Sequence, residues 1–130
     1  GQHCPNCKIS HGEHLVRNIL TNLNISFKMQ MKYDGLNGIG GRKLSYDFYL
    51  PTYNLLIEFQ GEQHERPVIF KGTNKEIAEE SFKKQQEHDK RKREYAKLHN
   101  IRLLEIWYYD INNIESIILN ALNTGKQKSA

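Results

Sequence analysis

The sequence predicts one α/β domain of the α+β type, with a central mixed four-stranded sheet flanked by helices. Three observations support this fold class. The 130 residues are enough for a single domain with its own hydrophobic core. Long helical patterns lie near both ends of the chain, around a meander of short strand patterns. The fourth strand pattern follows a long helix, so we expect that strand to run parallel to one of the first three.

The elements are expected in the order α-β-β-β-α-β-α. Two capping-box motifs predict the starts of the first and second helices, and the second helix should end near Leu98. These motifs are Ser10-x-x-Glu13 and Thr73-x-x-Glu76. Asp110 or Asn112 would cap the last helix, whose apolar side ends at Leu122.

Period-two apolar patterns bounded by turn residues predict the four strands. They cover residues 25–31, 44–50, 55–60 and 101–108. Residues 34–42 are expected to form a glycine-rich loop, which lacks the dinucleotide-binding pattern because a strand rather than a helix follows it. Residues 51–54 are expected to form a turn.

Positive charge is concentrated in one segment of the chain. Lys and Arg number 19 and Asp and Glu number 15, which gives a net charge of +4. Residues 83–97 alone contain seven Lys or Arg and three Asp or Glu, so this segment carries the whole excess. Such a helix face could bind phosphates, with affinity but no sequence choice. The other interpretation is a solvated face with i,i+4 ion pairs such as Glu87–Arg91.

The composition excludes several classes of protein. Apolar runs are too short to span a bilayer, and no basic segment followed by an apolar one opens the chain. We therefore expect no membrane partner and no secretory signal. Both cysteines, Cys4 and Cys7, lie in one CxxC motif, which excludes a disulfide framework and favours an intracellular setting. A thioredoxin-like redox pair is disfavoured because no strand precedes the motif.

Two carboxylates occupy positions where apolar residues are expected. If residues 51–54 form a four-residue hairpin loop, Leu50 faces Leu55, and Asp47 lies opposite Glu58 on the same face. Like charges repel there, and Glu58 sits inside the apolar run LLIEF. A hard divalent cation bound by both carboxylates is the simplest explanation. An exposed edge hairpin with two solvated acids is the alternative.

Asp89 and Glu13 are further acidic candidates with two interpretations each. Asp89 shares a helical stripe with Ala78 and Ala96, so it should face the sheet. The alternative is that it merely forms an ion pair with Lys92 or Arg93. Glu13 leans toward the core, but it could equally bond back to the helix cap at Ser10.

His64 and Gln60 lie at the end of the third predicted strand. His64 could be a general base or a metal ligand, although lone surface histidines are common. Gln60 lies two residues beyond Glu58 and therefore on the same face. Its amide could orient a water molecule or a phosphate oxygen there.

The ordered motifs resemble one branch of the PD-(D/E)XK nuclease superfamily. YDFYLP, LLIEFQGEQH, QQEHDKRKREYAK and IRLLEIWY are similar to segments of phage and bacterial endonucleases related to very-short-patch repair nucleases. The resemblance covers residues 11–122 and is closest to phage homing-type endonucleases with the EDxHD pattern. It implies a restriction-endonuclease-like core and a DNA endonuclease that uses Mg²⁺ or Mn²⁺ to hydrolyse phosphodiester bonds.

The resemblance also implies a set of site residues. The catalytic residues would be Glu13, Asp47, Glu58, Gln60, His64 and Asp89, with Asp47 and Glu58 as metal ligands. The sequence departs from the E-x-K motif of the superfamily because Gln60 stands in place of the lysine. Activation of the attacking water would therefore depend on His64, and the role of Gln60 is left open.

The implied partner is double-stranded DNA, and a homodimer would allow cleavage of both strands. The phosphate-binding residues would be Lys83, Lys84, Lys90, Arg91, Lys92, Arg93, Lys97 and Arg42. A phage-encoded protein would act in the cytoplasm of a bacterial host. The competing hypothesis is a nucleic-acid-binding module of the same fold whose nuclease site has decayed.

The resemblance divides the chain into three parts. Residues 11–122 would be the catalytic domain and residues 123–130 a flexible tail. Residues 1–10 would be a linker or the remnant of an upstream zinc-binding segment, because a CPxC motif ends such a repeat in the resembling phage proteins. Cys4 and Cys7 would then form half of a Zn²⁺ site in the full-length protein. A zinc ribbon with a structural role is a third hypothesis.

Overall fold

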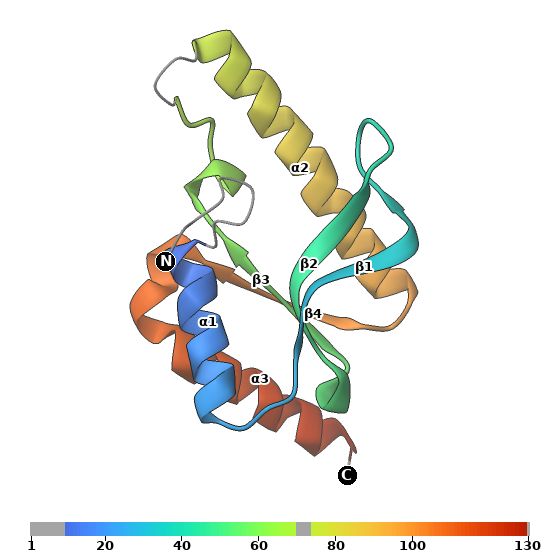
Figure 1. Cartoon of the computed structure of the whole chain (residues 1–130), viewed down its shortest axis with the longest axis vertical. Helices are drawn as coiled ribbons and strands as arrows, with labels where there is room; N and C mark the ends of the chain where they lie inside the picture. The colour runs from blue at the N-terminus through green and yellow to red at the C-terminus, as the bar shows by residue number, and fades with distance from the viewer. Residues whose placement is uncertain (1–9, 70–73, 130) are drawn as a thin grey trace, which may run out of the picture.

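A four-stranded mixed sheet forms the centre of the protein, with helices on both faces (Figure 1). The computed structural model describes residues 10–69 and 74–129, with side chains in the last helix described as far as Thr124. The strands, in sheet order, are β1 (Lys28–Asn37), β2 (Lys43–Leu50), β3 (Leu55–Gln60) and β4 (Arg102–Trp107). The first two pairings are antiparallel, and β3 and β4 are parallel, which confirms the predicted fold class.

Two helical layers enclose the sheet. The α1 helix (His11–Asn22) and the α3 helix (Ile114–Ser129) cover one face, and α2 (Lys75–Leu98) covers the other. Short 3₁₀ segments join these elements: η2 (Pro51–Tyr53), η3 (Glu62–His64) and η4 (Tyr108–Asn113). The α2 helix makes the crossover between the parallel strands β3 and β4.

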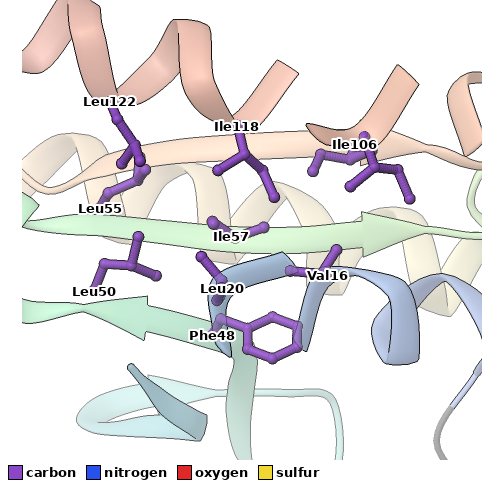
Figure 2. Packing of buried hydrophobic residues seen from close by; sticks show 10 residues of the cluster. Val16, Leu20, Phe48, Leu50, Leu55, Ile57, Ile106, Ile118 and Leu122 are labelled. Carbon is purple, nitrogen blue, oxygen red and sulfur yellow. The ribbon is translucent and has the colours of Figure 1, made fainter. Parts of the chain in front are cut away.

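The main hydrophobic core lies between the sheet and the α1–α3 layer. Figure 2 shows Val16 and Leu20 from α1 pointing toward Phe48 and Ile57 of the sheet, while Ile118 approaches from α3. A smaller cluster lies under α2 and consists of Leu36, Tyr46, Leu56 and Ala96. Strands β2 and β3 therefore each contribute side chains to both cores, one on each face of the sheet.

Only one of the predicted helix caps is present in the described structure. Ser10 Oγ accepts the backbone N–H of Glu13 at 3.2 Å, as predicted. The prediction that Thr73 caps α2 is wrong, because the cap is Asn74 and Thr73 lies outside the described residues. The η4 segment occupies residues 108–113, so α3 begins later than a cap at Asp110 or Asn112 would place it.

The boundaries of two elements also differ from the predictions. The first strand covers residues 28–37 rather than 25–31, because residues 34–37 of the expected glycine-rich loop belong to β1. Only residues 38–42 connect β1 to β2. The α3 helix continues to Ser129, beyond the predicted boundary at Leu122. Amphipathic periodicity identified the part of α3 that packs on the core, but not where the helix ends.

Near the middle of the β1–β2 hairpin, the side chains change the face of the sheet to which they point. Met29 and Phe48 are paired and pack on the main core, whereas the next pair on the same side, Met31 and Tyr46, packs in the cluster under α2. Side chains two residues apart normally point to the same face of a sheet. Between these pairs lies Gln30, whose φ of 53° is left-handed and breaks the regular strand. The distortion occurs directly beside Asp47.

Candidate active site

The hairpin of β2 and β3 has the register that the sequence predicted. Leu50 pairs with Leu55, Tyr49 with Leu56 and Phe48 with Ile57. Continuing this register by one residue places Asp47 opposite Glu58. The expectation that these two acids meet on the sheet is therefore confirmed, and the alternative of two solvated acids is wrong because Glu58 is buried.

Side-chain carboxylates replace backbone acceptors where Asp47 meets Glu58. The backbone N–H of Asp47 donates to Glu58 Oε1 at 2.9 Å. The backbone N–H of Phe59 donates to Asp47 Oδ2 at 2.8 Å. These bonds satisfy buried backbone donors at the point where the hairpin distorts. They also fix both carboxylates, each of which retains an oxygen for another partner.

Four of the predicted catalytic residues line one pocket with a volume of about 280 Å³. They come from four different elements: Glu13 from α1, Asp47 from β2, Glu58 from β3 and His64 from η3. The cap of α1 brings Glu13 to the pocket, and the exit of β3 through Gly61 brings His64. The fold thus brings together residues separated by as many as 51 positions in the sequence, from Glu13 to His64.

The fifth predicted residue, Asp89, orients His64 from behind. His64 Nδ1 lies 2.8 Å from Asp89 Oδ2, and both side chains are largely buried. Because a carboxylate only accepts, this bond places a proton on Nδ1, and in the neutral imidazole Nε2 is then an acceptor. Gln85, one turn earlier on α2, donates from Nε2 to Asp89 Oδ1 at 3.0 Å. The prediction that Asp89 faces the sheet is confirmed, and its partner is His64 rather than Lys92 or Arg93.

Lys92 is a pocket residue that the sequence analysis assigned to the outer basic face. Its Nζ lies 2.9 Å from Glu58 Oε2, and only 12 % of its side chain is exposed. Tyr46 holds the helix at this point by donating its hydroxyl to the Lys92 carbonyl oxygen at 2.7 Å. The helical periodicity of α2 indicates that Lys92 points inward, because it is three residues after Asp89 and four before Ala96 on the buried stripe.

Burial and mutual repulsion make the three pocket acids weaker acids than usual. Burial and the adjacent Asp47 raise the pKa of Glu58 to about 7. Burial and Glu13 raise the pKa of Asp47 to about 6. The pKa of Glu13 is also raised, by burial and by Glu58. Lys92 acts in the opposite direction on all three acids. The pocket therefore favours additional positive charge or protonation.

The donor chemistry of this pocket fits a hard divalent cation. Among the described residues, no three His, Cys, Asp or Glu side chains are arranged as a ready-made metal group. Mg²⁺ commonly binds to only one or two protein carboxylates, however, and keeps several of its waters. Asp47 and Glu58 provide two adjacent carboxylates, with Glu13 in the same pocket. These residues satisfy that requirement.

Gln60 takes part in a different network from the pocket acids. It is buried on the same side of β3 as Glu58, as expected, but its Nε2 donates to Glu105 Oε1 at 2.7 Å. Arg93 of α2 binds the same carboxylate, with Nη2 lying 2.6 Å from Glu105 Oε1. The amide nitrogen of Gln60 is thus bound to Glu105 on β4, and its buried Oε1 has no hydrogen-bond partner among the described residues. Gln60 is not among the residues that line the pocket, so its position does not support the predicted role in orienting water.

The predicted phosphate-binding residues fall into two groups. Arg91 binds Glu87 at 2.7 Å, so the ion-pair interpretation holds at that position, and Arg93 and Lys92 are also paired with acids. The remaining members are exposed and consist of Lys83, Lys84, Lys90, Lys97 and Arg42. Lys83, Lys90 and Lys97 are spaced by seven residues and so share one stripe of α2. That stripe is the strongest candidate for a phosphate-binding face.

Two further observations complete the description of the chain. Within the described ranges, no helix combines the length and apolar composition needed to cross a membrane. The candidate zinc ligands Cys4 and Cys7 lie outside the described residues.

Comparison with known proteins found no family model that matches the chain and no significant match among curated proteins.

Proposed function

We propose that this chain is the catalytic domain of a metal-dependent DNA endonuclease of the phage homing type. The observation that carries the proposal is the convergence of Glu13, Asp47, Glu58 and His64 on one pocket, with Asp89 behind His64. These are the residues that the resemblance to EDxHD nucleases selects. They come from distant parts of the sequence, and their position in one pocket supports the resemblance.

The pocket residues divide the work of phosphodiester hydrolysis between them. Asp47 and Glu58 would hold Mg²⁺ or Mn²⁺, with Glu13 completing the negative surroundings. When bound, the ion stabilises the charge that develops on the phosphoryl oxygens and acidifies the attacking water. The carboxylates already have fixed positions through the Asp47 and Phe59 backbone N–H groups, so little reorganisation is needed to bind a cation.

His64 is suited to be the general base. Its Nε2 accepts a proton from water as the water oxygen bonds to phosphorus and the bond from phosphorus to the leaving oxygen breaks. The leaving oxygen takes a proton from solvent. Asp89 holds the imidazole through Nδ1 and stabilises the positive charge that His64 acquires. The pair thus performs the proton transfer without the lysine that the sequence lacks at position 60.

The exposed lysines of α2 would bind the DNA backbone beside the pocket. Lys83, Lys90 and Lys97 span about 21 Å along the helix, from the rise of about 1.5 Å per residue. This length matches several consecutive phosphates of a DNA strand. Such contacts position the duplex without reading its sequence. The protein would act on double-stranded DNA in the cytoplasm of a bacterial host.

A binding module with a decayed nuclease site is the second candidate. Gln60 favours it, because a lysine is expected at that position. Gln60 binds Glu105 outside the pocket, however. The absence of a lysine at position 60 therefore leaves Glu13, Asp47 and Glu58 in place in the pocket. The test is incubation of supercoiled plasmid with purified protein and Mg²⁺, Mn²⁺ or EDTA. Conversion to nicked or linear DNA that EDTA abolishes supports the nuclease, and binding without conversion supports the module.

A further inference from the structure

Lys92 forms the one ion pair between a basic side chain and an acid of the pocket among the described residues. Its Nζ contacts Glu58 Oε2 at 2.9 Å, and Glu58 is 3 % exposed. With Glu13, Asp47 and Glu58 ionised, the acids and Lys92 together carry two net negative charges, which matches one divalent cation. A buried ion pair contributes little net stability, because desolvation offsets most of the attraction. The ion pair therefore calls for a functional explanation.

The anchoring of Lys92 leaves its ammonium group free to change partners. The hydroxyl of Tyr46 fixes the backbone of the residue by donating to the Lys92 carbonyl oxygen, and the ammonium lies over the Tyr46 ring, with Nζ 5.7 Å from its centre. Beyond the backbone, a lysine side chain has four rotatable carbon–carbon bonds and a point charge that accepts varied geometries. The ammonium already lines the pocket, so it can reach a ligand there without movement of α2.

A cation bound at Asp47 and Glu58 would repel the ammonium of Lys92. Like charges a few ångströms apart in a partly buried site repel about as strongly as the existing ion pair attracts. The released ammonium needs an anion, and in this pocket the incoming anion is a DNA phosphate. Lys92 is thus held by Glu58 before the cation binds and is available to phosphate afterwards.

We propose that Lys92 couples the two binding events of this site, by leaving Glu58 for a DNA phosphate when a divalent cation binds the pocket acids. This inference rests on the proposed nuclease function and assigns a positioning role to a residue outside the family pattern. The coupling is reciprocal, so DNA should raise the affinity for the cation by the same factor by which the cation raises the affinity for DNA.

Charge alone and release of Lys92 predict different results for the Lys92→Met variant. A divalent cation adds the same two charges to both proteins, so a purely through-space effect strengthens DNA binding equally in wild type and variant. Direct phosphate contact by a released lysine adds to the coupling in the wild type only. The test is the dissociation constant of a short duplex with and without Ca²⁺, with a gel to verify that the duplex stays intact.

We expect the Ca²⁺-induced gain in DNA affinity to be at least about fivefold smaller in Lys92→Met than in the wild type. Lys92→Arg, which keeps the charge, should retain most of the gain. Lys90→Met is the matched control, because it removes an exposed lysine from the same helix. That control should weaken DNA binding equally with and without Ca²⁺.

A second readout verifies that the pocket of the variant is intact. Without DNA, at a pH of about 8.5 where the acids are ionised, Lys92→Met should bind Ca²⁺ more tightly than the wild type in calorimetry, because the competing ammonium is gone. Equal coupling in wild type and Lys92→Met would overturn the inference while leaving the nuclease intact, provided that the wild type cleaves plasmid. Absence of both cation binding and cleavage in the wild type would overturn the proposed function as well.

Discussion

Asp47 and Glu58 lie directly opposite each other on β2 and β3, and each carboxylate accepts a backbone N–H from the other strand. Two like charges in these positions repel, and both are largely buried. The interlocked hydrogen bonds hold them together against that repulsion. The result is a pair of acids whose positions are fixed in advance and whose charge calls for a cation, a combination that suits a metal-dependent site better than a purely structural one.

The strain on Asp47 predicts a pH-dependent gain in stability for Asp47→Asn. The amide keeps an acceptor for the Phe59 N–H but removes a carboxyl whose pKa is about 6 in the folded protein. A carboxyl with a raised pKa carries no penalty when protonated in both states, and its full penalty appears once pH exceeds the folded pKa. In urea unfolding, Asp47→Asn should equal wild type near pH 3, below the unfolded pKa of about 3.8, and exceed it by about 1–3 kcal/mol near pH 8.

Asp34→Asn is the control for this pH dependence. Asp34 is an exposed acid whose pKa is lowered by its hydrogen bond with Lys43, so the sign of its contribution is opposite. Its removal should give no gain in stability between these pH values. If the free energies of unfolding of wild type and Asp47→Asn changed in parallel with pH, the ionised Asp47 would not destabilise the folded protein, contrary to this prediction.

His64→Ala should lower the single-turnover rate of DNA cleavage by about 10²–10⁴-fold, which is the usual contribution of a general base. DNA affinity should remain close to that of the wild type, because Nε2 acts on the water rather than on the backbone. Asp89→Asn should also lower the rate, because an amide does not hold the proton on Nδ1 and does not stabilise the imidazolium. An exposed histidine at the end of α2, His99, supplies the control variant His99→Ala, which should cleave normally. Equal rates for wild type and His64→Ala would refute this role.

Gly12 provides a test of how α1 positions Glu13. A Cβ at Gly12 would overlap the ring of Phe59, far inside van der Waals contact. Replacing glycine by alanine within a helix normally stabilises it by about 0.5–1 kcal/mol. Here the overpacking should reverse the sign, to a loss of about 1–3 kcal/mol in the free energy of unfolding. Cleavage should also fall, because α1 must shift and Glu13 moves with it.

The exposed residue Asn18 lies on the same helix and is the control for that substitution. Asn18→Ala should leave stability unchanged or raise it slightly, as helix propensity predicts. A Gly12→Ala protein more stable than wild type would show that α1 does not pack as closely on β3 as the structure indicates.

Salt dependence distinguishes free lysines from paired arginines on α2. Lys90 is exposed, so Lys90→Ala should reduce the slope of log affinity for DNA against log salt by about 1. Arg93 is bound to Glu105, so Arg93→Ala should change that slope little and instead lower the thermal midpoint. Dissociation constants at several KCl concentrations provide the measurement. If both variants changed the slope equally, Arg93 would have to leave Glu105 to bind phosphate.

Much of the fold and the pairing of Asp47 with Glu58 could be predicted from local patterns, whereas Glu13 and His64 were selected by the resemblance. The β2–β3 register followed from the length of one turn, and it placed Asp47 opposite Glu58. Helical periodicity correctly turned Asp89 toward the sheet. These features depend on residues that are close in sequence, where spacing determines which side chains share a face.

Features that depend on tertiary contacts could not be predicted in this way. The extension of β1 through residues 34–37 depends on pairing with β2, which overrides the loop-forming tendency of a glycine-rich stretch. The partner of Gln60 is Glu105, which the β3–β4 register pairs with Glu58 and so places diagonally to Gln60 on the same face. Lys92 was grouped with its basic neighbours by charge, although its position on the helical stripe with Asp89 indicated that it points inward.

The most direct test of the account is cleavage of supercoiled plasmid by the wild type and by Asp47→Asn, each with Mg²⁺ and with EDTA. The account predicts conversion to nicked or linear DNA by the wild type in Mg²⁺ alone, and a rate at least about 100-fold lower for Asp47→Asn. The variant should remain folded and bind DNA. Cleavage by the wild type that persists in EDTA, or equal cleavage by Asp47→Asn, would contradict a nuclease site built on these carboxylates.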